Sequence, residues 1–181
     1  MCNYVYYITR VVRIADVEAA KRAVEIVKEL MKLHLHGVYV HLQGNRIVVE
    51  APSYEHEFAE RVRKNIEAAY TAILVERVLQ SMGFLTHLSF SLDSEQRLVA
   101  SITAQRSDGA IATATITAES VFMDTANMGP HCVALAHELA QSLQSQGIEA
   151  SIESMQLKEE AGYQTQVQEI AIDHQTLYYS M

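Results

Sequence analysis

The residues best suited to chemistry lie together near position 131. His131, Cys132, His137 and Glu138 fall within a short stretch directly after Pro130. Pro is favoured at the first position of a helix, so we expect a helix that begins at Pro130 and has Cys132 as its third residue. The N-terminus of a helix stabilises a thiolate through its partial positive charge and free amides, and His131 could act as a base beside it. This pattern fits a small thiol-dependent enzyme or redox protein.

The same stretch also fits an ordinary packed helix. Cys132, Ala136 and Leu139 recur on one side of it, and a free cysteine is commonly buried as a small hydrophobic residue. His137 follows Cys132 by five positions, which turns it about 140° away around the helix. We therefore keep Cys132 with His131 as the alternative hypothesis and a packing role as the leading one.

Three histidines, His34, His36 and His41, lie around a predicted hairpin. His34 and His36 could share a face if their segment is extended. A metal site needs further ligands, and the sequence has no Cys-x-x-Cys or His-Glu-x-x-His pattern that would supply them. We therefore expect no metal site and no cofactor, and we interpret these histidines as surface or packing residues.

One long helix, predicted over residues 53–83, organises the chain. Ser53 is a good N-cap residue, and Gly83 suits the position after a helix because it reaches a positive φ without steric cost. Phe58, Val62 and Ile66 begin an apolar stripe with helical spacing.

The second half of this helix is apolar around most of its circumference. A helix of that kind must be covered on most sides. We expect either the strands after Gly83 or a second copy of the chain to cover it, and we favour a dimer because each half of the chain looks too small to wrap the helix alone. The residues predicted to form this interface are Leu74, Val75, Val78 and Leu79.

The elements before and after the long helix predict an α+β fold. The first half has the order of a ferredoxin-like βαββαβ unit, in which both helices cover one face of an antiparallel sheet. A β-rich ββαβ second half follows, and residues 119–128 stay unassigned. The predicted strands are residues 3–14, 38–42, 46–50, 84–92, 97–105, 110–117, 148–152 and 167–173, and the other helices are residues 17–33 and 130–147.

Charge divides the chain near Gly83. Residues 1–83 hold 11 Lys/Arg and 10 Asp/Glu, a net charge of +1, whereas residues 84–181 hold 3 Lys/Arg and 12 Asp/Glu, a net charge of −9. We expect a module of residues 1–83 that continues into strand 84–92 and an acidic module of residues 93–181, or one compact domain made from both. The acidic balance counts against nucleic acid as a partner.

Composition also bears on the compartment. The two cysteines, Cys2 and Cys132, give no disulfide framework, and the N-terminal residues do not read as a signal peptide. No run of residues is apolar for long enough to span a membrane. We therefore expect a cytoplasmic protein with no membrane partner.

Two stretches resemble known families. The run from Glu57-Phe58-Ala59-Glu60 through Ala69-Tyr70 to Ser81-Met82-Gly83-Phe84 resembles a conserved chloroplast and cyanobacterial reading-frame family of unknown function. The run from Gly129-Pro130-His131-Cys132 to Glu138-Leu139 and Gly147 resembles a small companion family. Both families are uncharacterised, so the resemblance implies no activity.

The leading hypothesis is a non-enzymatic interaction or assembly module that associates with itself or with another protein. It rests on the apolar second half of the long helix and on the lack of a convergent polar constellation in the sequence. The rival is the thiol-dependent enzyme or redox protein that uses Cys132 with His131. Neither hypothesis specifies a ligand, a substrate or a pathway.

Overall fold

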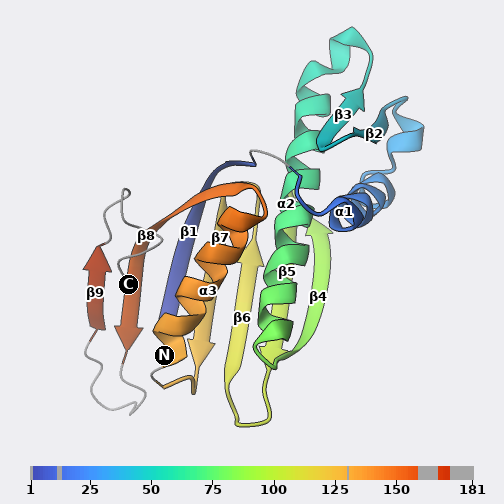
Figure 1. Ribbon diagram of the computed structural model, residues 1–181. Coiled ribbons are helices and arrows are strands. Elements are labelled where there is room, and N and C mark those ends of the chain that lie inside the picture. The colour runs from blue at the N-terminus through green and yellow to red at the C-terminus, as the bar shows by residue number, and fades with distance from the viewer. Residues whose placement is uncertain (1, 12–13, 130, 159–166, 172–181) are drawn as a thin grey trace.

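The computed structural model describes the backbone of residues 2–11, 14–129, 131–158 and 167–171, and the side chains of residues 14–129 and 131–149. The described residues form strands, α-helices and two short 3-10 helices (Figure 1). In chain order these are β1 (Cys2–Val11), α1 (Val17–Leu30), η1 (Leu33–Leu35), β2 (Tyr39–Gln43), β3 (Arg46–Glu50), η2 (Ser53–Glu55), α2 (His56–Ser81), β4 (Leu85–Leu92), β5 (Leu98–Gln105), β6 (Ile111–Ile116), β7 (Ser120–Ala126), α3 (His131–Ser145), β8 (Ile148–Lys158) and β9 (Val167–Ala171).

A seven-stranded antiparallel sheet forms the centre of the molecule, with the strand order β4-β5-β6-β7-β1-β8-β9. The N-terminal strand β1 lies between β7 and β8, so the sheet combines segments from both sides of Gly83. The α+β class predicted from the sequence is confirmed. The segment 119–128, which the sequence left unassigned, contains β7.

The ferredoxin-like pairing is not the one that forms. β2 and β3 pair only with each other among the described strands, while β1 lies inside the large sheet and β4 at its edge. α1 packs against α2 and β2 instead of covering the sheet. The physical reason is that β1 takes its partners from strands formed much later in the chain, and element order alone does not reveal such pairing.

Two helices cover one face of the large sheet. α2 packs against β4, β5 and β6, and α3 packs against β8 and α2 (Figure 1). Along β5, β6 and β7 the residues alternate between buried and more exposed positions, as expected when one face packs and the other meets solvent. Many buried positions under α2 are small, which lets the helix approach the sheet closely. They include Ala100, Ala104, Ala112 and Ala114.

The long helix predicted from the sequence is confirmed for residues 56–81, but its first turn differs. Ser53–Glu55 forms a 3-10 turn, and α2 has no side-chain hydrogen bond at its N-cap residue, Glu55. The predicted capping role of Ser53 is therefore wrong. Pro52 has an extended conformation, and the 3-10 turn that follows it leads directly into α2.

The C-terminal end of α2 forms as predicted. Gly83 has a φ of +91°, and the N–H of Phe84 donates to the carbonyl of Leu79 at 3.1 Å, which closes the helix with a left-handed residue. Arg106 reinforces this end, because its Nη1 donates to the Met82 carbonyl at 3.2 Å and its guanidinium lies 4.9 Å from the centre of the Phe84 ring. A cation at this position also complements the negative end of the helix dipole.

Tyr70, at the middle of α2, joins three segments that are distant in the sequence. Its side chain is fully buried. Its hydroxyl accepts from the backbone N–H of Ala15 at 3.2 Å and of Asp16 at 3.3 Å, and it donates to the carbonyl of Gln146 at 3.2 Å. Asp16 also forms an ion pair with Arg77, which lies about two turns after Tyr70 on α2. The start of α1 and the end of α3 are therefore both fastened to α2 at one point.

Candidate functional site

The four residues predicted to form a dimer interface lie in the core of the single chain. Leu74, Val75, Val78 and Leu79 are 3%, 0%, 6% and 0% exposed. From the sequence, either the strands after Gly83 or a second copy was expected to cover this part of α2. The structure shows that the strands after Gly83 cover it, together with α3. The argument that each half of the chain is too small was wrong because β1 joins the second-half strands in one wide sheet. These side chains present no surface to a second copy.

Among the described residues α3 begins at His131, so Cys132 lies in its first turn. Its side chain is 4% exposed. It is disulfide-bonded, and the described part of the chain contains no free cysteine. Both hypotheses from the sequence treated Cys132 as a free cysteine, and that expectation is corrected. His131 is exposed beside it. In this state the Cys132 sulfur is neither a thiolate nor open to solvent, and Pro130 lies outside the described residues.

Among the described residues, no group of three or more His, Cys, Asp or Glu side chains lies where it could hold a metal ion. His36 instead stacks on Phe58, with ring centres 4.9 Å apart at an angle of 41°. His34 and His41 are exposed. These histidines are surface and packing residues.

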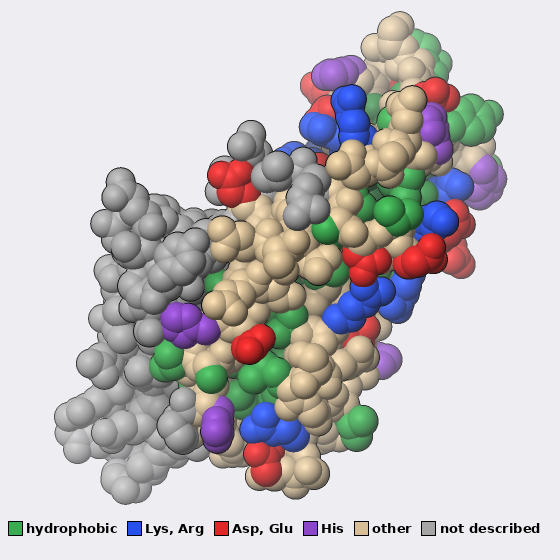
Figure 2. Space-filling view, viewed as in Figure 1, with side chains coloured by type: hydrophobic (Ala, Val, Ile, Leu, Met, Phe, Trp, Pro, Cys, Tyr) green, Lys and Arg blue, Asp and Glu red, His purple; other side chains and the backbone are tan. Residues whose placement is uncertain are grey.

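The surface around α1 carries charges of both signs. Figure 2 shows Lys/Arg and Asp/Glu side chains intermixed over α1 and the first turns of α2, towards the upper part of the view. Lys21 lies 3.4 Å from Glu18, and Lys28 lies 3.4 Å from Glu25. The basic side chains of this helix are thus offset by neighbouring carboxylates, as on a solvated helix face.

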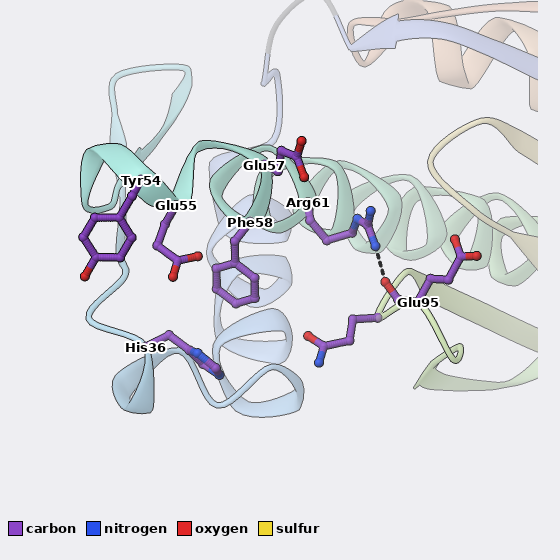
Figure 3. A pocket seen from close by; sticks show the side chains of 8 residues that line it. His36, Tyr54, Glu55, Glu57, Phe58, Arg61 and Glu95 are labelled. Atoms are coloured by element: carbon purple, nitrogen blue, oxygen red, sulfur yellow. Dashed lines mark hydrogen bonds between the residues drawn. The ribbon is translucent and has the colours of Figure 1, made fainter.

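A hollow of about 540 Å³ opens between η1, the first turns of α2 and the β4–β5 turn (Figure 3). In Figure 3 Phe58 and His36 point towards one another within it, and Arg61 donates a hydrogen bond to the backbone carbonyl of Glu95. The Arg61 guanidinium is thus already bound to the protein backbone through this hydrogen bond. The lining of the hollow combines aromatic, acidic and basic side chains. The hollow is lined by His36, Tyr54, Glu55, Glu57, Phe58, Arg61, Glu95 and Gln96.

A neighbouring hollow of about 420 Å³ surrounds the point where the β4–β5 turn is fixed to α2. Asn65 is 2% exposed, and its side-chain amide donates to the Gln96 carbonyl and accepts from the Leu98 N–H, both at 2.9 Å. Arg97 pairs with Asp93 inside the turn at 3.2 Å. The backbone N–H of Arg97, followed by that of Glu95 and by the Arg97 side chain, holds the pKa of Asp93 below its usual range. These polar groups therefore hold the β4–β5 turn in shape and attach it to α2.

Glu67 on α2 is the described carboxyl whose pKa is raised, and burial is the cause, partly offset by Lys64 and Arg63. This burial could not be predicted from the sequence, because Glu67 lies near the charged residues Arg63 and Lys64 on the same helix. Arg63 itself pairs with Glu60 at 2.8 Å. Glu67 is partly exposed, and the nearby Glu60 carboxylate adds a smaller upward contribution to its pKa.

The free edge of the large sheet is the most unusual surface of the molecule. Among the described strands, β4 ends the sheet and has β5 as its one neighbour (Figure 1). Its 8 residues, LTHLSFSL, include no charged residue and no proline. Their register with β5 is continuous from Leu85–Gln105 to Leu92–Leu98, so the strand has no bulge. Leu85 is 76% exposed at its beginning.

Side chains from α2 hold this edge strand in place. The Thr86 hydroxyl donates to Oε2 of Glu76 at 3.0 Å and accepts from Nε2 of Gln80 at 3.0 Å. Glu76 is 9% exposed, and its hydrogen bond to the strand is partly buried. β4 is therefore presented as a straight strand on a fixed support.

The outer face of the sheet beside this edge carries small hydroxyl side chains. Ser89 lies opposite Ser101, and Ser101 opposite Thr115. Thr103 in turn lies between His87 on β4 and Thr113 on β6. A shallow hollow of about 420 Å³ lies over the start of β4 and its neighbours. The strands β4, β5 and β6 that form this face contain no Asp, Glu, Lys or Arg.

The direction of the backbone groups along β4 follows from its hairpin. The N–H of Asp93 donates to the carbonyl of Arg97 at 2.9 Å, which closes the β4–β5 turn. In an antiparallel strand the backbone groups of successive residues point to opposite sides. The odd-numbered residues of β4 therefore face β5. The N–H and C=O groups at the free edge belong to Thr86, Leu88, Phe90 and Leu92.

Comparison with protein-family models, with curated proteins and with solved structures finds no match to this chain. Among the described helices, none combines the length and the apolar character that crossing a membrane requires.

Proposed function

We propose that this protein is a non-catalytic interaction and assembly module, and that it docks by adding a strand to the free edge of β4. The observation that carries the proposal is an edge strand of 8 residues with neither charge, proline nor bulge. Strand addition at a sheet edge is an established mode of protein recognition, in which backbone hydrogen bonds supply much of the affinity.

Proteins normally protect the open edges of their sheets. An open edge is an aggregation hazard, and edge strands are normally protected by lysine, by proline, by a bulge or by a covering element. β4 uses none of the first three, and β5 and α2 are the elements that pack against it. A straight unprotected edge held on a helix is what a docking strand requires.

The side chains of β4 that face α2 support the same proposal. Leu88, Phe90 and Leu92 pack against the core but stay only partly buried. They lie at the margin of the sheet, where α2 covers them from one side. A strand added beside β4 would complete their burial, and the apolar surface removed from water would favour docking.

The thiol-dependent alternative has weaker support. It needs Cys132 as an accessible thiolate with His131 as its base, whereas Cys132 is buried and disulfide-bonded. No observation on the described residues favours it over the docking function.

Amide hydrogen exchange followed by NMR tests the docking function. In the dilute monomer the amides of Thr86, Leu88, Phe90 and Leu92 should exchange fast, while those of the odd-numbered residues from 87 to 91 should be protected. When a partner docks, the four edge amides should become protected. Edge amides that are already protected in the monomer, or that stay unprotected in every complex the protein forms, would refute the proposal.

A further inference from the structure

We infer that the strand added to β4 is the β4 strand of a second copy, paired antiparallel about a two-fold axis that passes beside Ser89. This inference rests on the proposed docking function and names its partner. The pairing would join the seven-stranded sheets of two copies into one continuous sheet.

The register follows from the direction of the backbone groups. Residues directly opposite each other in an antiparallel pair share a face, so residues facing α2 must lie opposite residues facing α2 in the other copy. An axis beside Ser89 places Leu88 opposite the Phe90 of the second copy and Thr86 opposite its Leu92. All four outward-facing residues are then used, giving about eight backbone hydrogen bonds.

Other symmetric registers use the edge less completely. With the axis beside Leu88, the outward groups of Leu92 would fall opposite Phe84, which precedes the strand. With the axis beside Phe90, those of Thr86 would lie beyond Leu92, next to the β4–β5 turn. Either shift leaves one outward-facing residue of each strand unpaired and lowers the number of backbone hydrogen bonds to about six. The register centred on Ser89 is therefore favoured.

Charge explains why a second copy suits this edge. The chain carries a net charge of −8, so two copies repel each other over most approaches. β4 itself holds no Asp, Glu, Lys or Arg, and on the outer face the axis brings Ser89 against Ser89 and His87 against Ser91. Like charges directly opposite each other destabilise a strand pair, and this edge has none to bring together.

The pairing also limits itself. Each copy has one β4 edge, and a two-fold contact uses the same surface on both copies, so this contact closes as a dimer. A strand pair of this length buries less than a standard protein interface. We therefore expect reversible association with a dissociation constant in the micromolar range, on the order of 1–100 µM.

Disulfide trapping tests the register. In a non-hydrogen-bonded pair the Cα atoms lie about 4.5 Å apart, within the range that a disulfide can bridge. The Ser89→Cys protein should therefore form a covalent dimer under mild oxidation, seen on a non-reducing gel.

Two matched controls keep the test specific. Ser101→Cys lies directly opposite Ser89 on β5, and its copies would be about 14 Å apart, three strand spacings. Ser91→Cys lies on β4 itself, but its copies would be displaced by four residues, about 14 Å along the strand. Neither variant should form the covalent dimer. A dimer trapped equally by Ser91→Cys or Ser101→Cys would overturn the register.

Sedimentation over about 1–300 µM protein tests the partner. Ser89→Lys should weaken dimerisation about fivefold at low salt, because it places two lysines opposite each other at the axis, and Ser101→Lys should have a smaller effect. A wild-type protein that stays monomeric over this range would overturn the second copy as the partner. The edge amides would then still report whether another protein docks there, so the two proposals fail separately.

Discussion

Removing the Tyr70 hydroxyl should weaken the whole fold although it deletes one atom from the middle of a helix. The phenolic oxygen receives two backbone N–H groups and donates to one carbonyl, at 3.2–3.3 Å. Tyr70→Phe keeps the ring in its buried place and removes these three hydrogen bonds together. It therefore isolates the polar contribution of this contact from the packing of the ring.

The expected loss follows from the surroundings of the three partners. A hydrogen bond contributes about 0.5–1.5 kcal/mol net, and a buried group left without a partner costs about 1–3 kcal/mol. Ala15 is exposed, and Asp16 and Gln146 are partly exposed, so water can reach some of the released groups. We therefore expect the free energy of unfolding to fall by about 2–3 kcal/mol, near the lower end of these ranges.

Urea unfolding followed by circular dichroism measures this loss, since the chain has no Trp to report by fluorescence. In a thermal scan the same loss should lower the Tm by about 4–12 °C for a chain of this size. Tyr54→Phe is the matched control, because it deletes the same atom from a side chain that is 83% exposed. If both variants have the stability of the wild type, Tyr70 does not fasten α1 and α3 to α2 and our reasoning about the centre of the molecule is wrong.

Two further predictions concern the polar groups that hold α2 to its neighbours. Asn65→Ala should lower the free energy of unfolding by about 2–4 kcal/mol, because it leaves the Leu98 N–H and the Gln96 carbonyl without their partner; urea unfolding measures it, and an unchanged midpoint would contradict it. The pKa of Asp16 is lowered chiefly by the Ala19 N–H, with Arg77 adding to it, so its contribution to stability is complete above about pH 4 and is lost as the pH falls through the folded-state pKa. Unfolding between pH 2 and 7 should show this loss, and Asp16→Asn should make stability less dependent on pH in that acidic range.

Local signals in the sequence predicted most of the individual elements. The apolar stripe and Gly83 located α2 and its end, because a positive φ after a helix is a local requirement that Gly meets. The turn at Gly44 located the β2–β3 hairpin in the same way, with a φ of +64°. These features depend on neighbouring residues, and a single sequence contains them.

The pairing of strands depends on contacts between distant residues, and the sequence did not reveal it. β1 pairs with β7, more than a hundred positions later, and nothing in its composition distinguishes a central strand of a wide sheet from a strand of a ferredoxin-like unit. The hydroxyl of Tyr70 was missed for a similar reason, because its partners lie 55 and 76 positions away. Residues 172 and 173 of the last predicted strand fall outside the described part of the chain.

The apolar surface of α2 that suggested a dimer is buried within the single chain, and the partner proposed above docks at a different element, β4. α2 needs no second copy, because the sheet and α3 bury Val75 and Leu79 completely. α2 lies over one face of the sheet at β4, β5 and β6. It shields β4, the last strand, from one side only, so the edge of the sheet stays partly exposed. Leu88 and Phe90 therefore stay half-buried where an added strand would complete their burial. The packing that buries α2 within one chain thus leaves the edge of β4 as the surface where we expect a partner to dock.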